Sequence, residues 1–113
     1  MKPRIIHPEE LEKKDFGPII VSDFLNDPNY EKFSIAKVII KGKQKKGYDS
    51  KSDIAYYVLD GEGKFVLGDK ENSVKKGDLI FIPSGTPYKD DGNLTLLAIS
   101  SPRFDRSKRV YVE

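Results

Sequence analysis

Short apolar runs separated by glycine, proline and charged residues predict that this chain is built from β-strands. Each run is at most eight residues long, and β-branched and aromatic residues are common in these runs. Strands of this length at this spacing are typical of a β-sandwich or a barrel. The predicted strands are residues 33–40, 54–59, 64–67, 72–74, 79–82 and 93–100.

The centre of the pattern lies at residues 54–67. An apolar run ends in Asp60-Gly61-Glu62-Gly63, and a second apolar run follows at once. A glycine-rich tetrapeptide between two strand-like runs predicts a hairpin with a tight turn. A further turn is expected at residues 75–78, just before the run 79–82.

Both faces of the strand at 54–59 are apolar. Alternation places Ile54 and Tyr56 on one face and Ala55 and Tyr57 on the other. A small barrel with a solvent-exposed outer face should alternate between apolar and polar residues instead. We therefore expect the outer face to be covered by the N-terminal arm or by another subunit, and we favour a homodimer.

Residues 1–33 are the least regular part of the chain and are predicted to form an arm that packs on the barrel or on a partner subunit. A single helical turn is expected over residues 8–14, with Pro8 near its start. Residues 19–25 are read as an early strand or as part of the arm. Residues 34–113 should hold the barrel and a C-terminal tail, with the whole chain forming one domain.

Composition narrows the function classes. The 113 residues are 37% hydrophobic and 34% charged, with a net charge of +2 and no cysteine. No apolar run approaches the ~20 residues that cross a bilayer, and the N-terminus has no apolar signal-peptide core. The lysine-rich segment 41–51 is read as a solvated loop, and no nucleic-acid-binding signature is found. We expect a cytoplasmic protein with neither a nucleic-acid nor a membrane partner.

The spacing of several residues resembles the cupin superfamily of small jelly-roll barrels. The first cupin motif runs Gly, five residues, His-x-His, three or four residues, Glu, six residues, Gly. Gly42, Tyr48, Ser50, Ile54 and Gly61 keep that spacing here.

The second cupin motif is Gly, five residues, Pro-x-Gly, two residues, His, three residues, Asn. Gly77, Pro83, Gly85 and Tyr88 keep its spacing, with Gly92 at the Asn position. The resemblance covers roughly residues 34–101 and implies an all-β double-stranded β-helix, the cupin jelly-roll barrel, with an irregular N-terminal arm.

The same resemblance implies that the usual metal site is missing. Cupins that bind a metal use four motif positions, which hold Tyr48, Ser50, Ile54 and Tyr88 here. Serine and protonated tyrosine are poor ligands for a divalent transition metal, and isoleucine is none. The only histidine, His7, lies in the irregular N-terminus. We therefore expect no metal and no cofactor.

Two acidic residues near the first motif are also expected to lie outside the site. Strict alternation points Asp49 and Asp53 away from the face that carries Tyr48 and Ser50.

Hydroxyl groups would then line the barrel interior. Tyr48, Ser50, Tyr56 and Tyr88 are the predicted ligand-binding residues, because several buried hydroxyls each need a partner. The alternative is a barrel closed by its own side chains. Asp90 shares parity with Tyr88, so these two are the catalytic candidates, although residues 89–92 are most simply read as a polar turn.

Three basic residues have two interpretations each. Lys37 either faces the interior, where it would pair with an anion, or faces solvent while Val38 and Ile40 face inward. Arg103 and Arg106 either reach a pocket rim or a partner subunit, or form surface salt bridges.

Three functions follow, in descending order. The first is a metal-independent cupin that binds a small polar organic ligand, sugar-like or a carboxylate. The second is a metal-independent sugar or sugar-phosphate isomerase or epimerase, which needs a base poised near neutral pH. The third is a divergent metal-dependent dioxygenase.

Overall fold

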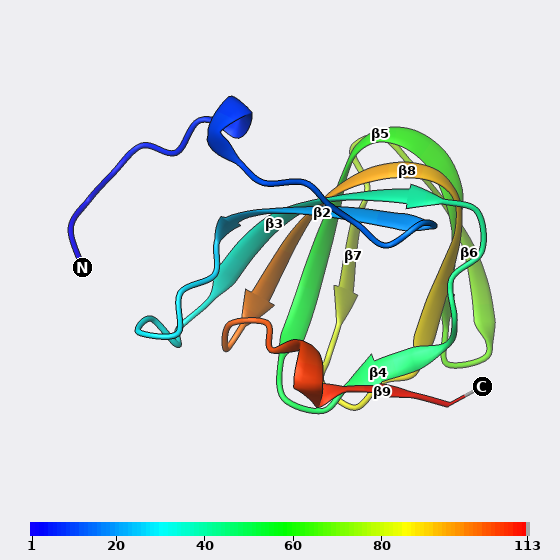
Figure 1. The fold of residues 1–113 in the computed structure, drawn as a ribbon. Helices are drawn as coiled ribbons and strands as arrows, with labels where there is room; N and C mark the ends of the chain where they lie inside the picture. Colours follow the sequence, from blue (N-terminus) through cyan, green and yellow to red (C-terminus); the bar gives the residue numbers. More distant parts are fainter. Residues whose placement is uncertain (113) are drawn as a thin grey trace.

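The computed structural model describes residues 1–112, and these form one curled β-sheet of nine strands (Figure 1). Two single-turn 3-10 helices, η1 (Pro8–Glu10) and η2 (Arg106–Lys108), lie near the ends of the chain. The all-β jelly-roll barrel predicted from the sequence is confirmed. The strands are β1 (Lys14–Asp15), β2 (Ile19–Leu25), β3 (Ser34–Lys41), β4 (Gly47–Asp49), β5 (Asp53–Leu67), β6 (Lys70–Lys75), β7 (Leu79–Ile82), β8 (Tyr88–Ser101) and β9 (Arg109–Tyr111).

Two long antiparallel strands, β5 and β8, form the backbone of the barrel. They pair along their whole lengths, from Asp53 opposite Ser101 to Leu67 opposite Tyr88. The register shifts between Val58 and Asp60, which is a bulge that helps both strands to bend. One half of this ribbon pairs with β7 and β3, and the other half pairs with β6 and, at its end, with β4.

The hairpin predicted at residues 60–63 is wrong, because β5 runs through this segment without turning back. Its glycines serve a close approach between strands instead. A Cβ atom on Gly61 would clash with the carbonyl oxygen of Asn93, and one on Gly63 with the carbonyl oxygen of Asp91. Gly61 also has a φ of 91°, which disfavours any other residue. A glycine pair in a strand pattern can therefore mark a bend rather than a turn.

The polar turn predicted at residues 89–92 is wrong as well, since this segment is the first half of β8. Asp90 lies opposite Phe65 and Gly92 lies opposite Gly63 on β5. The strand is polar here because it lines a cavity rather than the apolar core.

The hydrophobic core fills the interior between β3, β5 and β8. Val58, Phe65 and Leu96 are fully buried, with Leu94 close behind. On β3, Val38 and Ile40 face this core, so Lys37 points to the opposite, outer face. The interior reading of Lys37 is therefore wrong.

The two ends of the chain join the barrel differently. The N-terminal turn is confirmed as η1, and β2 pairs with β3 along six residues, so part of the predicted arm is a strand of the sheet. Residues before β1 extend away from the barrel (Figure 1). The C-terminal strand β9 pairs with β4. Among the described residues, no helix has the length and apolar character needed to span a membrane.

The outer face of the barrel keeps exposed apolar side chains. Tyr57, Leu79 and Phe81 are 41%, 63% and 60% exposed, and they lie next to one another on β5 and β7. The N-terminal arm does not cover them, so that part of the expectation is wrong.

Candidate functional site

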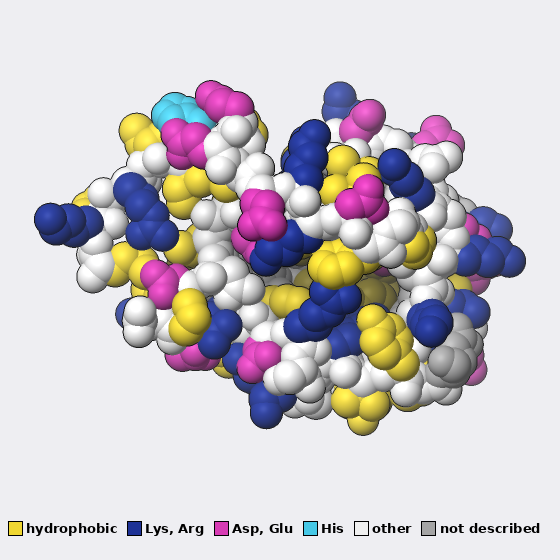
Figure 2. Space-filling model, viewed as in Figure 1, with side chains coloured by type: hydrophobic (Ala, Val, Ile, Leu, Met, Phe, Trp, Pro, Cys, Tyr) yellow, Lys and Arg dark blue, Asp and Glu magenta, His cyan; other side chains and the backbone are white. Residues whose placement is uncertain are grey.

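A cavity of about 750 Å³ opens on one side of the barrel. Its walls come from β2, the loop before β4, the first half of β8 and the C-terminal segment. In the space-filling view, Lys and Arg side chains gather around a hollow near the centre of this face (Figure 2). Ile40 and Tyr88 line the cavity and also belong to the core, so the core forms the cavity floor.

Two tyrosines meet at this floor. The hydroxyl oxygens of Tyr56 on β5 and Tyr88 on β8 are 2.7 Å apart and form a hydrogen bond. The Tyr88 ring stacks against Phe65 at a centroid distance of 6.4 Å, and Tyr88 is 3% exposed. Burial raises the pKa of both tyrosines, so both hydroxyls stay protonated at neutral pH. The pair can donate hydrogen bonds, but neither member is a base at neutral pH.

Asp90 lies two residues after Tyr88 on β8 and therefore on the same face. It is 6% exposed, and its Oδ1 atom has no hydrogen-bond partner among the described residues. Burial raises the pKa of Asp90 from 3.8 to about 6, Arg109 opposes this shift, and Asp91 adds to it. Asp90 is thus a carboxyl group that titrates close to physiological pH.

Arg109 supplies a positive charge from the C-terminal strand. Its guanidinium carbon lies 4.4 Å from the centroid of the Tyr88 ring and 5.6 Å from that of Tyr111. Gly47 on β4 makes room for this strand, since a Cβ there would lie 2.6 Å from the carbonyl oxygen of Val110 and 3.3 Å from Arg109 Nε. Arginine stays charged at any physiological pH, so the floor holds a fixed cation beside a titratable carboxyl.

Positively charged side chains dominate the cavity lining. Cationic residues clearly outnumber acidic ones along the walls, which favours an anionic or partly anionic ligand. The cationic residues are Lys14, Lys43, Lys45, Lys89, Arg103, Arg106 and Arg109, and the acidic residues are Asp23, Asp90 and Asp105.

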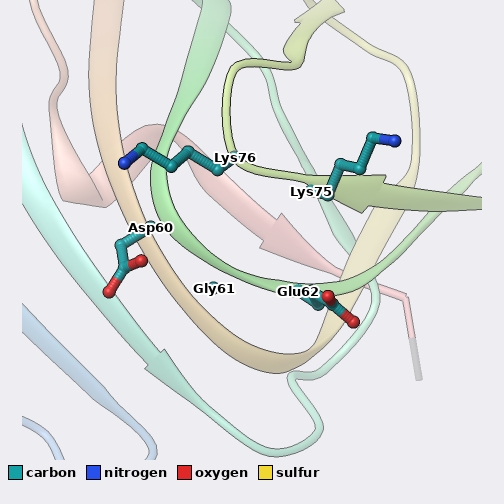
Figure 3. Close-up of a pocket in the computed structure, with 5 residues that line it drawn as sticks. All are labelled: Asp60, Gly61, Glu62, Lys75 and Lys76. Carbon is teal, nitrogen blue, oxygen red and sulfur yellow. The ribbon is translucent and has the colours of Figure 1, made fainter.

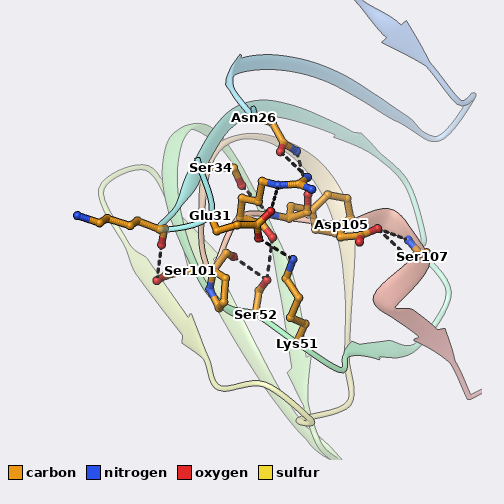
Figure 4. Close-up of polar contacts among 12 residues, drawn as sticks. Asn26, Glu31, Ser34, Lys51, Ser52, Ser101, Asp105 and Ser107 are labelled. Carbon is orange, nitrogen blue, oxygen red and sulfur yellow. Dashed lines mark hydrogen bonds and ion pairs between the residues drawn. The ribbon is translucent and has the colours of Figure 1, made fainter. Parts of the chain in front are cut away.

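A network of polar contacts anchors the C-terminal segment beside the cavity (Figure 4). Arg103 Nε donates to Glu31 at 2.7 Å, and its Nη1 donates to Asn26 Oδ1 at 3.3 Å. Lys51 lies 3.5 Å from the other oxygen of Glu31. The hydrogen bond from Arg103 lowers the pKa of Glu31, so this ion pair persists at neutral pH. Arg103 both lines the cavity and makes a salt bridge, which combines its two predicted roles.

A second contact ties the two ends of the chain together across the cavity mouth. The guanidinium carbon of Arg106 in η2 lies 3.9 Å from the centroid of the Phe16 ring, just after β1. Asp105 is the N-cap of η2, and the hydrogen bonds that it accepts from Ser107 lower its pKa. Arg106 therefore reaches the rim rather than lying apart on the surface.

The structure brings some of the predicted site residues together and leaves others outside. Tyr56, Tyr88 and Asp90 line the cavity. Tyr48 and Ser50 are not part of its lining; Ser50 is exposed and donates to the carbonyl oxygen of Lys108 at 2.6 Å.

Alternation holds within β4, since Asp49 and Tyr48 lie on opposite faces, but the buried residue is Asp49, whereas Ser50 is exposed. As expected, neither Asp49 nor Asp53 is part of the cavity lining. Asp49 Oδ1 accepts hydrogen bonds from the backbone N–H groups of Lys51 at 2.8 Å and Ser52 at 2.6 Å. This side-chain turn ends the strand after three residues, so a pattern extended from Gly42 to Ile54 does not hold across it.

Sequence reasoning missed Arg109 and Tyr111. Both lie in the tail, whose many charges favoured a surface reading. The available signal was the short run 109–112, in which aromatic and β-branched residues reappear and predict a strand.

Two further features of the described residues do not form a site. No group of three or more His, Cys, Asp or Glu residues is placed so that it could hold a metal ion. A smaller hollow of about 320 Å³ lies on the surface, where Lys75 and Lys76 point away from each other (Figure 3). The side chains around it do not converge on a common point. It is lined by Asp60, Gly61, Glu62, Lys75 and Lys76.

Comparison with known proteins establishes the class. The cupin domain family matches residues 39–94, and the chain belongs to the cupin superfamily. An uncharacterized protein of Aquifex aeolicus (strain VF5) is 35% identical over 93% of this chain and 89% of its own length. The uncharacterized protein MJ1618 of Methanocaldococcus jannaschii is 34% identical over 83% of this chain and 82% of its own.

Solved structures of low sequence identity share the fold. A variant of Streptomyces Pac13 with uridine superimposes with a TM-score of 0.87 at 22% identity, over 99% of this chain and 92% of that one. Pac13 is described as a nucleoside dehydratase. KdgF from Halomonas sp. has a TM-score of 0.81 at 17% identity, over 94% of this chain and 99% of that one. The polyketide cyclase RemF from Streptomyces resistomycificus has a TM-score of 0.80 at 19% identity, over 100% of this chain and 87% of that one.

Proposed function

We propose that this cupin binds a small polar organic anion, a sugar-like molecule that carries a carboxylate, in the barrel cavity. The observation that carries the proposal is the cavity floor, where Tyr56, Tyr88 and Asp90 lie beside Arg109. Hydroxyl groups of a sugar could accept from the tyrosines and donate to Asp90, while Arg109 could pair with a carboxylate.

The size of the cavity favours a ligand over a closed core. Ligand sites are usually clefts of roughly 300–1,000 Å³ with an apolar lining and a few converging polar groups. The cavity of about 750 Å³ falls in that range, and Phe16, Ile19 and Ile40 supply apolar surface. Its cationic walls would attract an anion and speed its association.

The structural neighbours are compatible with a ligand of this kind. The Pac13 structure contains uridine, a small molecule with several hydroxyl groups, in a protein of the same fold. Uridine is uncharged, whereas the cavity of this chain is lined mainly by cations. We therefore propose an anionic ligand rather than a neutral nucleoside.

Isothermal titration calorimetry with D-glucuronate and D-glucose tests the proposal. The two compounds share a pyranose ring and differ in a carboxylate. Binding of glucuronate at least about tenfold tighter than glucose would support it, since one charge-assisted contact contributes about 1.5–3 kcal/mol. Uridine serves as the uncharged comparison, and the titrations are repeated with protein treated with a chelator. Equal or tighter binding of both uncharged compounds, binding that chelation abolishes, or binding of none of the three would contradict the proposal.

We also propose that a second copy of the chain covers the apolar outer face. Tyr57, Leu79 and Phe81 form a continuous exposed patch on β5 and β7. Within the described residues β7 pairs only with β5, so its other edge is open for backbone pairing. A short strand can pair antiparallel with the same strand of a second copy about a twofold axis, which would extend the sheet and the patch together.

A further inference from the structure

We infer that the cavity floor is an acid–base catalytic site, in which Asp90 moves a proton on a carbon atom next to a carbonyl group of the bound ligand. The inference rests on the proposed function, because it uses the same cavity and the same sugar-like acid. It adds a reaction, and it assigns a separate role to each polar group on the floor.

The first argument is the position of Asp90. A buried carboxyl normally has its oxygens satisfied by hydrogen bonds, and an orphaned oxygen needs an explanation. Asp90 is 6% exposed, lines the cavity, and has no partner for Oδ1 among the described residues. Asp49 offers a contrast, since it also has one unpartnered oxygen but accepts two backbone hydrogen bonds at the other and is not part of the cavity wall. Asp49 shapes a turn, whereas Asp90 faces a space that a ligand can enter.

The second argument is the tyrosine pair. When two hydroxyls are 2.7 Å apart, one donates its proton to the other, and the second keeps a proton to donate elsewhere. Tyr56 makes its side-chain hydrogen bond to Tyr88, and Tyr88 lies next to Asp90 along the same face of β8. This leaves one hydroxyl proton for the carbonyl oxygen of a ligand. Arg109, over the face of the Tyr88 ring, adds a fixed positive charge where negative charge would develop.

The reaction is balanced by these groups alone. The ionised Asp90 takes a proton from the carbon next to the carbonyl, and the electrons of the broken C–H bond form a carbon–carbon double bond. The carbonyl oxygen becomes an enolate oxygen, stabilised by the tyrosine hydroxyl and by Arg109. Asp90 then returns the proton, either to the same carbon or to the former carbonyl carbon once the enediol proton has shifted between the oxygens. The ligand is neither oxidised nor reduced overall, and no other reactant is needed.

Protonation of Asp90 gives the site a defined pH dependence. Burial raises the pKa of Asp90 to about 6, and a general base works best with a pKa near the working pH. The base form therefore increases as the pH rises from 5 to 7. The charged and titratable groups around it are Arg109 on β9, Tyr56 on β5, Tyr88, Lys89 and Asp91 on β8, and Lys43 and Lys45 at the cavity wall.

Deuterium exchange tests this reaction without knowledge of the natural product. The protein is incubated in D₂O with D-glucuronate, D-galacturonate or D-ribose 5-phosphate, each of which has a carbonyl carbon next to a C–H bond, hydroxyl groups and an anion. Proton NMR follows loss of the C2 proton signal, and calorimetry measures the affinity of each variant for the same compound. We expect enzyme-dependent exchange in at least one compound, with a rate that rises roughly tenfold per pH unit below pH 6 and levels above it.

The variants separate catalysis from binding. Asp90→Asn should lower the exchange rate roughly 100-fold or more, while the dissociation constant changes less than about threefold. Tyr88→Phe should lower the rate by about tenfold. Asp69→Asn, the same change in the exposed turn between β5 and β6, away from the cavity lining, should exchange like the wild type.

The outcomes distinguish this inference from the proposed function. A compound that binds without exchange, or exchange that survives in Asp90→Asn, overturns the acid–base assignment and leaves the binding proposal in place. Failure of all three compounds to bind overturns both. Should Asp90→Asn not fold, the wild-type pH profile decides, because a rate that does not change between pH 5 and 7 overturns the role of Asp90.

Discussion

The hydroxyl groups of Tyr56 and Tyr88 meet at 2.7 Å, and this contact joins β5 to β8 at the floor of the cavity. Both strands also carry residues of the hydrophobic core, so the floor rests directly on that core. The remaining groups come from a different source. Arg109 and Tyr111 belong to a short C-terminal strand that pairs with β4, and Asp90 lies where β8 leaves the core.

The tyrosine pair predicts a measurable coupling in stability. Tyr88→Phe should lower the free energy of unfolding by about 1–3 kcal/mol, since it leaves the buried hydroxyl of Tyr56 without a partner. The variant with both tyrosines replaced by phenylalanine should lose less than the sum of the two single changes, because no orphaned hydroxyl remains. Urea unfolding of the four proteins measures this coupling. Additive losses would mean that the hydroxyls do not interact in solution.

The sequence pattern predicted the barrel because alternation and turn residues repeat along most of the chain. It failed at residues 60–63 and 89–92 for one physical reason. Glycine and charged residues suit turns, but they also suit a strand that bends against its neighbour or lines a polar cavity. The residue pattern of one strand does not show which of these applies, because that depends on the strand with which it pairs.

The candidate site was predictable only where a residue lies on a long, regular strand. Tyr56 followed from alternation along β5, Tyr88 from its position in the second cupin motif, and Asp90 from its parity with Tyr88. Tyr48 and Ser50 were placed from the first motif, but the buried residue of β4 is Asp49, and Ser50 lies in the turn that the Asp49 side chain forms. Arg109 lies far from the motifs in sequence and reaches the site only through the pairing of β9 with β4.

Arg109 should determine the preference for an anion. Arg109→Met should weaken glucuronate binding by roughly 10- to 100-fold and change glucose binding little, since only the former loses a charge-assisted contact. Lys108→Met is the matched control, because it removes an exposed positive charge one residue away. Isothermal titration calorimetry with both sugars gives, for each variant, the ratio of its dissociation constant to that of the wild type. An equal loss for both variants would point to a general effect of net charge.

Gly61 should be far less tolerant of a side chain than Gly77. The two have nearly the same φ, 91° and 93°, but a Cβ on Gly61 would clash with the backbone of β8 whereas one on Gly77 meets nothing within 4 Å. Gly77→Ala should cost about 1–2 kcal/mol from backbone strain alone. Gly61→Ala should cost about 2–3 kcal/mol more, because two strands must separate. Thermal and urea unfolding of both variants measure the difference, and equal costs would show that β5 and β8 can adjust without loss.

The outer face should control the oligomeric state. Light scattering coupled to size-exclusion chromatography should give a dimer for the wild type and a monomer for Phe81→Lys, since an unpaired charge in an apolar interface is strongly unfavourable. Leu59→Lys, an apolar-to-charged change on β5 two residues beyond the segment that pairs with β7, should weaken the dimer less. A wild-type protein that is monomeric at high micromolar concentration would contradict the proposal that this apolar face is a dimer interface.

The pKa of Asp90 predicts how stability depends on pH. The folded protein raises this pKa from 3.8 to about 6, so between these values the folded state binds more protons than the unfolded state. The contribution of Asp90 to the free energy of unfolding is therefore highest below pH 4. It falls as the pH rises towards 6 and stays low above that. A shift of about two units corresponds to roughly 3 kcal/mol. Asp90→Asn cannot titrate and should lack this decrease.

The measurement is the free energy of unfolding of both proteins from urea titrations at pH 4, 5, 6 and 7. Subtracting one profile from the other removes the groups that titrate in both, among them Glu31 and Asp105, whose pKa values are lowered and whose contributions are lost as the pH falls. The variant also leaves Arg109 without its neighbouring carboxylate, but that guanidinium stays charged over the whole range. The variant should therefore gain about 2–3 kcal/mol relative to the wild type between pH 4 and pH 7. If the difference in unfolding free energy between the two proteins stays constant with pH, the pKa of Asp90 has its ordinary value. Asp90 would then not be a base with a pKa near neutrality.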